Sequence, residues 1–423
     1  MKTNDNASPL QVRLSELARQ LSEDPLLGPL VQPGQLESFL QGAFSELLQA
    51  ALLKERQFHL EDHPTDRANG FAPKRTLQIG TTPVSLQVPR TRQAFYPAVL
   101  PKHQRALPES YQRLLEDVLL QAKSFKAALR TLQAMGLPYA PDQLEDLLQE
   151  LDHQAKEFFS RPLAADWFFL FIDAKVIELK DEQNHIKKAV HFLVVGVSLV
   201  GRKEVLTAQT FWGNEAIDAW RQVLVGLKNR GLTRALFVVT DDFSGLAPLI
   251  KTLLPGADHQ LCCVHLFRNA HRHLNSADFL LFKQTWKEIC ATSSFEAAAQ
   301  KFQTLLDQLR PHNSSFVDHL HKRKSHYLAF MKYPNSIRGH IRSTNLPEGI
   351  NNLIETIRRN SGGHFHSERE ARIKLKLLVD QLYQGRWKSP NRHITAVLQP
   401  LTTLFRQRFE SELPSDQLLT QTF

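Results

Sequence analysis

The spacing of apolar residues changes along the chain, and each change predicts a different kind of structure. Residues 10–58 carry apolar side chains three and four positions apart, which predicts amphipathic helices. Residues 108–160 show the same helical period. Between them, Arg75–Arg90 alternates apolar and polar residues around a Gly-Thr-Thr-Pro turn, a pattern typical of a β-hairpin. We therefore predict a mainly helical N-terminal region that contains one hairpin.

A β-rich section begins at Trp167. Three runs in close succession, WFFLFIDAKVIEL, KKAVHFLVVGVSLVG and RKEVLTAQTFWG, predict an antiparallel meander. Residues 215–230 then predict a helix that ends at Gly231, residues 235–242 a short apolar strand, and residues 244–254 a second helix. The order β-β-β-α-β-α predicts a mixed α/β core in which a parallel strand lies beside the meander.

Helical periodicity dominates again after Pro255. Two later helices are predicted over Pro347–Arg359 and Glu368–Tyr383, separated by the breaker SGGHFHS. The pattern therefore divides the chain into an N-terminal region (1–162), a first part of the α/β core (163–254), an all-helical stretch (255–335), a second part of the core (336–390) and a polar tail (391–423).

The composition is that of a globular protein. The 423 residues are 42% hydrophobic and 22% charged, which suits two or three domains and excludes a disordered or collagen-like chain. Three cysteines exclude a disulfide framework, and the first residues, MKTNDNASPL, lack the apolar core of a secretion signal. No apolar run approaches the ~20 residues that cross a bilayer. We expect a soluble protein of a reducing compartment.

The net charge of +9 is compatible with a polyanionic partner. Residues 321–388 hold 14 Lys and Arg against 5 Asp and Glu, so this segment alone carries a net charge equal to that of the chain. Its placement favours phosphate contact by Arg358, Arg359, Lys374 and Lys376. The ends of the predicted hairpin carry four more cations, which suit either DNA contact or a solvated surface: Lys74, Arg75, Arg90 and Arg92.

Two aspartates occupy unusual places in the predicted strands. Asp173 lies within an apolar strand, where a carboxylate is costly unless it has a partner or a metal ion. Asp241 ends another apolar strand, and strand ends are where α/β sheets build sites. Neighbouring strands lie about 5 Å apart, so both carboxylates could share a cation, and oxygen ligands favour Mg²⁺ or Mn²⁺. Either aspartate alone would more often be a cap or turn residue.

The third carboxylate of such a site has two candidates. Glu348 lies in the first turn of the helix predicted after Asn345, and Glu355 lies two turns further on nearly the same face. An acid in the first turn is also favoured by the helix dipole alone. The residues by themselves leave the choice open.

A Cys-x-x-His pattern runs from Cys262 to His265. It could be half of a zinc site, although the remaining ligands are not evident and Cys290 is distant in the sequence. A buried Cys/His packing pair at a helix start is the preferred interpretation.

Taken together, these motifs resemble those of the Mutator-type bacterial insertion-sequence transposases, a family of DDE transposases. The matching segments occur in the family's order over about residues 40–385. They are RANGFAPKRTLQIG with VSLQVPRTRQAFYP, FLFIDAKVIELK, KKAVHFLVVGVSLVGRKEVL, FWGNEAIDAWRQVLVGLKNRGL, VVTDDFSGLAPLI, HQLCCVHLFRN and IRSTNLPEGINNLIETIRR. One departure is Asp242, where the family usually has Gly; Asp241 keeps the strand-end position.

The resemblance implies a fold and a chemistry. The fold would be an RNase H-like α/β core with a mixed sheet, interrupted by an all-α insertion domain and preceded by a mainly helical DNA-binding region. Asp173, Asp241 and Glu348 would be the catalytic triad and would hold two Mg²⁺ (or Mn²⁺) ions about 3.5–4 Å apart for phosphoryl transfer. Cys262 and His265 would be structural supports near that site.

The resemblance also implies partners and a place in the cell. These are double-stranded DNA, as terminal inverted repeats and as target, and a second copy of the chain in a homodimer. Arg342 and Asn345, next to Glu348, would join the basic residues in contacting DNA. The protein would be cytoplasmic, in a bacterium, and associated with the nucleoid. A transposase-derived DNA-binding regulator without catalysis and another RNase H-like nuclease are the alternatives.

Overall fold

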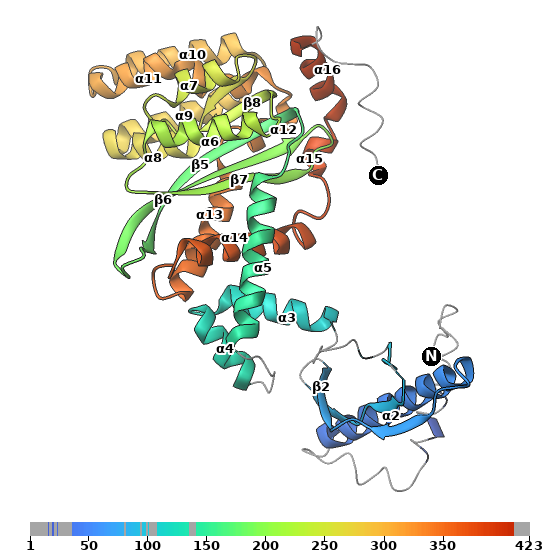
Figure 1. Cartoon of the computed structure of the whole chain (residues 1–423). Helices are drawn as coiled ribbons and strands as arrows, with labels where there is room; N and C mark the ends of the chain where they lie inside the picture. The colour runs from blue at the N-terminus through green and yellow to red at the C-terminus, as the bar shows by residue number, and fades with distance from the viewer. Residues whose placement is uncertain are drawn as a thin grey trace. The chain divides into compact units, whose positions relative to one another are not determined.

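The computed structural model describes residues 36–79, 82–93, 95–98, 100, 108–134 and 141–409, together with positions 16, 19, 20 and 23. The chain forms two compact units (Figure 1). Met1–Leu119 and Lys126–Pro141 make the N-terminal unit, and Leu120–Phe125 and Asp142–Phe423 make the core unit. Most of the helix predicted before residue 36 and the predicted turn residues Gly80 and Thr81 lie outside the described residues.

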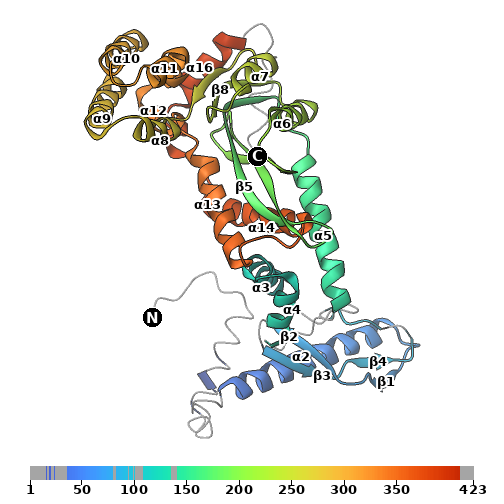
Figure 2. The same ribbon diagram turned by 90° about the vertical axis from the view of Figure 1, so that its left-hand side faces the viewer.

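The N-terminal unit is built from one long helix and short antiparallel strands. Figure 2 shows helix α2 lying along the strands, and its Leu52 packs with Leu77, Val84 and Leu86 in a small buried core. The Gln49 side chain exchanges two hydrogen bonds with the backbone of Gln87 at 2.8 and 2.9 Å. The predicted hairpin is confirmed. The elements are α2 (Leu36–Asp62), β1 (Ala68–Phe71), β2 (Arg75–Ile79), β3 (Thr82–Leu86), β4 (Pro89–Thr91), α3 (Pro108–Gln121) and α4 (Phe125–Ala134).

The core unit contains a five-stranded mixed sheet in the order β7-β6-β5-β8-β9. Strands β5, β6 and β7 form the predicted antiparallel meander, β8 is parallel to β5, and β9 is parallel to β8. Strand β9 lies in the stretch that the sequence predicted to be all-helical, so that prediction is wrong for these residues. A strand of four residues is too short to show a period in the sequence. The strands are β5 (Asp166–Lys180), β6 (Ile186–Ser198), β7 (Lys203–Trp212), β8 (Arg234–Thr240) and β9 (Asp258–Leu261).

Helices cover both faces of this sheet. On one face, α6 (Ile217–Asn229) and α7 (Leu246–Leu253) bury an apolar core, in which the Trp220 ring meets Phe192 edge to face at 4.6 Å. Gly196 on β6 leaves room for a neighbouring indole, since a Cβ there would lie 2.6 Å from Trp167 Cε3. Helices α13 (Asn345–Asn360) and α14 (Glu368–Gln384) belong to the opposite side (Figure 2).

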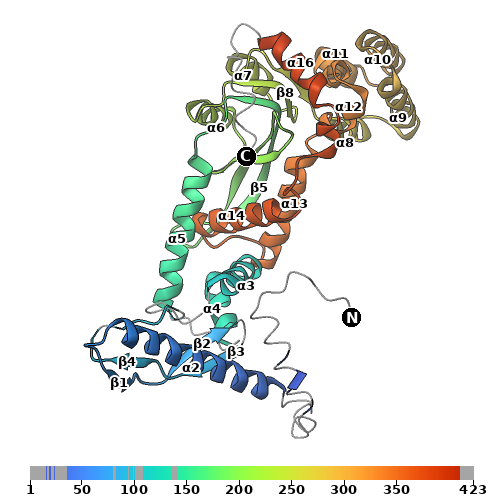
Figure 3. The ribbon, with the colours of Figure 1, turned by 90° about the vertical axis from the view of Figure 1, so that its right-hand side faces the viewer.

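Between β9 and α13 the chain forms helices and no further strand. Figure 3 shows α8–α11 gathered at one end of the sheet. Asn275, Ser294 and Asn313 cap α9, α10 and α11, each accepting a hydrogen bond from the backbone N–H three residues later. The elements are α8 (Cys263–His273), α9 (Ser276–Ala291), α10 (Phe295–Leu309), α11 (Ser314–Tyr327), the 3₁₀ turn η2 (Ala329–Lys332) and α12 (Asn335–Ile341).

Two segments join the core unit although the sequence pattern placed them elsewhere. Helix α5 (Pro141–Ser160), from the predicted N-terminal region, belongs to the core unit from Asp142 onward. The predicted polar tail instead forms α15 (Arg392–Thr395) and α16 (Leu398–Phe409). Phe405 of α16 packs against Phe168 of the sheet, with ring centroids 6.2 Å apart. Among the described helices, none is both long enough and apolar enough to span a membrane.

Candidate active site

Two of the predicted carboxylates lie on neighbouring strands. Asp173 lies within β5 and is 7% exposed, and Asp241 directly follows β8. The parallel ladder pairs Phe171 with Val239. Continued by two residues, this register brings Asp241 beside Asp173, at the usual strand separation of about 5 Å. The backbone pairing thus juxtaposes two carboxylates that are 68 residues apart in the chain.

The electrostatics of Asp173 connect all three predicted acids. Burial, which is the largest cause, and the negative charges of Asp241 and Glu348 together raise its pKa, to a net value of about 7. Two groups oppose the rise: Asn351 Nδ2 donates a 2.7 Å hydrogen bond to Asp173 Oδ2, and His265 contributes positive charge. A buried carboxylate that feels two further acids has an unfavourable charge, which a cation would relieve.

Helix α8 supplies partners to the two other acids. His265 Nδ1 lies 2.6 Å from Asp241 Oδ1, and Arg268, one turn later, donates to Glu348 Oε1. Glu348 itself lies in the first turn of α13. Residues three apart share a helix face, so one face of α8 pairs with two of the acids.

Glu355, the other candidate for the third acid, lies in a different environment. Its carboxylate is held by Arg358 at 2.7 Å, by Arg359 at 3.0 Å and by Lys175 at 3.6 Å. The hydrogen bond from Arg358 is the main reason that its pKa falls to about 2. These ion pairs neutralise Glu355, whereas the acids that contribute most to the pKa rise of Asp173 are Asp241 and Glu348. The geometry therefore favours Glu348 as the third acid.

The extra acid next to Asp241 also has its own partners. Asp242 accepts a 2.7 Å hydrogen bond from Arg323 Nε and lies 2.8 Å from His319 Nε2, both on α11. The carboxylate of Asp242 therefore binds helix α11, whereas the carboxylate of Asp241 contacts His265.

The Cys-x-x-His residues lie against the acids. Cys262 Sγ is buried and accepts hydrogen bonds from Thr344 N at 3.4 Å and Thr344 Oγ1 at 3.2 Å. Burial raises the pKa of Cys262, but bonds from His265 and Thr344 outweigh it, so the net pKa is lowered. For His265, burial lowers the pKa, while Asp241 and Cys262 raise it to a final value of about 10.

Three residues at the site were not identified from the sequence. Asn351 lies one helical turn after Glu348, and Arg268 one turn after His265, so the helical period was the available signal. Glu215, just before α6, accepts a 2.8 Å hydrogen bond from Trp220 Nε1. Its pKa is raised by burial and by the charge of Asp241. No pattern in the sequence points to it.

Several of the predicted DNA-binding cations are instead used within the protein. Lys374 is 1% exposed and is held by Glu370, Ser361 Oγ and Ala122 O at 2.7–3.0 Å, so the predicted phosphate contact of Lys374 is not supported. Arg358 pairs with Glu178 and Glu355. Lys376 pairs with Asp380 at 2.6 Å. Other cations of residues 321–388 balance acids elsewhere in the core unit: Arg323 pairs with Asp242, Lys332 with Asp258 and Arg372 with Asp152.

Other predicted DNA contacts lie at the surface. In the core unit, Arg359 is 75% exposed and Asn345 is exposed, while Arg342 is half-buried and donates to Cys290 Sγ at 3.0 Å. In the N-terminal unit, three of the four hairpin-end cations are exposed and one is half-buried. The exposed ones are Lys74, Arg90 and Arg92, and the half-buried one is Arg75.

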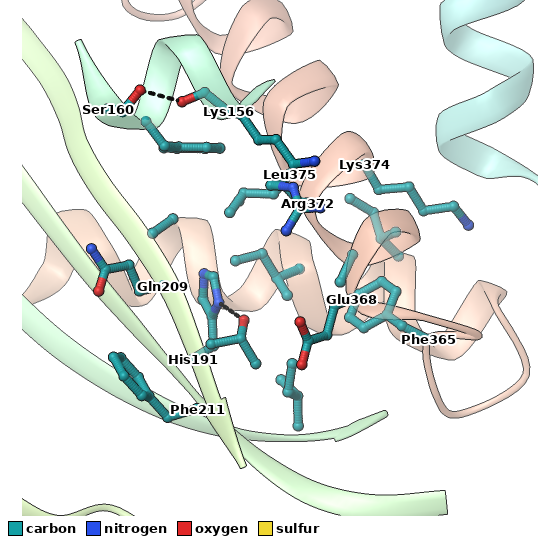
Figure 4. Close-up of a pocket in the computed structure, with 17 residues that line it drawn as sticks. Lys156, Ser160, His191, Gln209, Phe211, Phe365, Glu368, Arg372, Lys374 and Leu375 are labelled. Carbon is teal, nitrogen blue, oxygen red and sulfur yellow. Dashed lines mark hydrogen bonds between the residues drawn. The ribbon is translucent and has the colours of Figure 1, made fainter. Parts of the chain in front are cut away.

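A cavity of about 450 Å³ lies on the same side of the sheet as α13 (Figure 4). Ile354 and Ile357 of α13 line it, together with Phe365 and His191. The His191 ring makes a 3.0 Å hydrogen bond with Thr210, and burial lowers its pKa to about 4, which keeps it neutral. Glu368 is the one carboxylate among the lining residues. This cavity is therefore chemically distinct from the acid cluster, to which α13 contributes Glu348 and Asn351.

The charge on Asp173 should reduce the stability of the metal-free protein. Its pKa in the folded protein, about 7, lies above the unfolded value of 3.8, so the penalty is complete above pH 7 and disappears as the pH falls through 3.8. We expect Asp173→Asn to raise the free energy of unfolding by roughly 2–4 kcal/mol at pH 8 and by almost nothing near pH 4. Urea unfolding at the two pH values measures this. An equal effect at both would show that burial and the neighbouring acids do not perturb Asp173.

Comparison with known proteins gives one consistent family. Residues 15–389 match the family model described as "Transposase, Mutator family". The chain is 26% identical over 359 residues to the transposase for insertion sequence element ISRM3 of Rhizobium meliloti, covering 83% of this chain and 87% of that protein. It is 25% identical over 413 residues to the transposase for IS1081 of Mycobacterium tuberculosis, covering 96% of each chain.

Among solved structures, the Drosophila P element transposase strand transfer complex aligns with 74% of this chain and 89% of that chain. The sequence identity is 11% and the TM-score is 0.28. At this TM-score the alignment does not establish a common fold.

Proposed function

Because the chain belongs to the Mutator family of transposases, we propose that it cuts DNA at the ends of its insertion sequence and joins those ends to target DNA by metal-dependent phosphoryl transfer. The observation that carries this proposal is the convergence of three carboxylates from separate segments: the β5–β8 register brings Asp241 beside Asp173, and one face of α8 contacts both Asp241 and Glu348. Their segments are an internal strand, a strand end and the first turn of a helix. Three neighbouring carboxylates repel one another and destabilise the folded protein, and few purely structural roles require such an arrangement.

The donor set suits Mg²⁺ or Mn²⁺. All three acids offer oxygen ligands, which hard divalent cations prefer. Two bound ions would supply activation of the attacking oxygen and charge stabilisation at the leaving oxygen. Each acid has a partner in the metal-free protein. Asn351 orients Asp173, His265 neutralises Asp241, and Arg268 neutralises Glu348. Arg268 is half-exposed and could exchange Glu348 for a DNA phosphate.

The fold that we propose for the core is RNase H-like. The strand order β7-β6-β5-β8-β9, with three antiparallel strands followed by two parallel ones, supports it. The helices after β9 would then be an insertion between the second and third acids. The insertion would begin after Leu261, since β9 completes the sheet.

DNA would be held by polar and basic side chains at the surface. In the core unit these are the exposed Arg359 and Asn345 and the half-buried Arg342. In the N-terminal unit the candidates are Lys74, Arg75, Arg90 and Arg92, which we assign to the terminal inverted repeats. Since two DNA ends must be joined to one target, we expect a homodimer.

The test uses the purified full-length chain, a labelled duplex bearing one end of the insertion sequence, and an unlabelled target duplex. In Mg²⁺ we expect a nick or break at the end and a covalently joined end–target product. A chelator should remove both products. Binding without any cleavage would instead identify a regulator, and hydrolysis without joining would identify a nuclease of a different kind.

A further inference from the structure

The Cys-x-x-His pattern lacked further metal ligands in the sequence, and the fold supplies one. The carboxylate of Asp241, the thiol of Cys262 and the imidazole of His265 offer three ligand atoms that all lie within 4.8 Å of one another. Asp241 comes from the end of β8, whereas Cys262 and His265 come from the start of α8. We propose that these three residues bind a thiophilic divalent ion, zinc, at a site that overlaps the acid cluster through Asp241.

The ligand chemistry favours zinc over magnesium at this position. A sulfur, a nitrogen and an oxygen ligand form a typical tetrahedral zinc set, with bonds of about 2.3 Å to sulfur and about 2.0–2.2 Å to nitrogen or oxygen. Magnesium prefers oxygen ligands alone. Ligand atoms of a tetrahedral zinc ion lie about 3–4 Å apart, and the 2.6 Å between Asp241 Oδ1 and His265 Nδ1 requires only a small separation.

The burial of the three ligands suits a site that is entered from one side. Cys262 is 1% exposed and lies at the bottom, whereas Asp241 and His265 are both about one-third exposed at the side chain. Asp241 Oδ1 and His265 Nδ1 are themselves shielded from solvent and lie against each other. The fourth position of the ion would face the open side, where water could occupy it.

Neighbouring groups are already arranged around the ligands. The Thr344 backbone N–H and hydroxyl both donate to Cys262 Sγ, an arrangement that supports a thiolate. Binding would release the thiol proton and the proton between His265 and Asp241 to solvent. His265 Nε2, which lies 3.1 Å from Arg268 Nη1, would keep its proton when Nδ1 binds the ion. The half-exposed Arg268 would have to turn away from it.

Zinc at this site would take Asp241 away from the catalytic acids. This consequence rests on the proposed function, whereas zinc binding itself does not. In the presence of Mg²⁺ we expect added Zn²⁺ to slow DNA-end cleavage, and a chelator selective for zinc to restore it.

The deciding measurement is metal binding by the full-length, metal-free chain. We expect one Zn²⁺ per chain by equilibrium dialysis, and Co²⁺ in its place should give a thiolate-to-cobalt charge-transfer absorption band. Cys262→Ser should abolish the band, and His265→Gln should weaken the affinity by at least about tenfold. Cys290→Ser is the matched control and should keep both the cobalt band and the wild-type zinc affinity.

Several outcomes would overturn the site. Absence of the cobalt band in the wild type would leave Cys262 and His265 as structural supports, and loss of the band in Cys290→Ser but not in Cys262→Ser would place the metal elsewhere. If Cys262→Ser does not fold, His265→Gln decides the matter, because His265 is partly exposed. A chain that binds zinc but never cuts DNA would contradict the proposed function alone.

Discussion

Asp173→Asn, Asp241→Asn and Glu348→Gln each reduce DNA-end cleavage and strand transfer by at least about 10³-fold in Mg²⁺. Each change replaces a charged oxygen ligand with a neutral amide of the same shape, which weakens the hold on a divalent ion. The measurement is the rate of product formation from a labelled end duplex. Fluorescence anisotropy with the same duplex should show unchanged binding, because no basic residue is altered.

Two neighbouring acids serve as matched controls for these variants. Glu355→Gln and Asp242→Asn should retain cleavage, because Glu355 is engaged by Arg358 and Arg359, and Asp242 by Arg323. Cleavage at the wild-type rate by any variant of the three proposed acids would refute the assignment. Loss of cleavage in Asp242→Asn with full activity in Asp241→Asn would exchange the roles of the two aspartates.

Lys374→Met lowers the free energy of unfolding by about 3–5 kcal/mol. The ammonium group of Lys374 lies 3.0 Å from Glu370 in the interior, where both side chains are almost fully buried. Removing the cation leaves Glu370 Oε1 without its partner in the interior, while His366 stays at Oε2, and it also removes two hydrogen bonds, to Ser361 and Ala122. Urea unfolding of the full chain, followed by far-ultraviolet circular dichroism, measures the loss.

A double variant separates the structural role of Lys374 from DNA binding. Lys374→Met with Glu370→Gln should recover most of the lost stability, because no buried charge remains. The exposed Arg359 is the contrasting case: Arg359→Gln should leave stability almost unchanged but make DNA binding less dependent on salt. If the Lys374→Met chain were as stable as the wild type but bound DNA more weakly, Lys374 would be a DNA-contacting residue after all.

Most secondary structure could be predicted because its signals are local. The three runs after Trp167, the helix that carries Trp220 and the helix that carries Glu348 each show their own period within about 15 residues. Strand β9 and helix α16 could not be predicted in the same way. Strand β9 has only four residues. Helix α16 mixes charged and apolar residues on its buried side, which blurs its apolar period: Phe405 packs in the core, while Arg408 bonds Leu236 O and pairs with Asp258.

The basic surface shows where the sequence pattern misled. Counting charges in residues 321–388 treats every cation as free, but a charge count carries no information on partners. Arg338, for example, is buried and donates to four backbone carbonyls at the turn around Tyr333 and after α9. Those partners lie up to 46 residues away in the chain, beyond the reach of any local pattern.

By itself, the sequence determined most of the strands and helices and the unusual positions of Asp173 and Asp241, because periodicity and a polar residue in an apolar run are visible within a few residues. Only the tertiary structure showed that Glu348 and Glu355, which lie on nearly the same helix face, have different partners: Arg268 for Glu348, and Arg358, Arg359 and Lys175 for Glu355. It also placed Asp241 beside Cys262 and His265, and it separated the buried Lys374 from the exposed Arg359. Each of these results depends on distances between segments that are remote in the chain, and such distances are set by sheet register and helix packing.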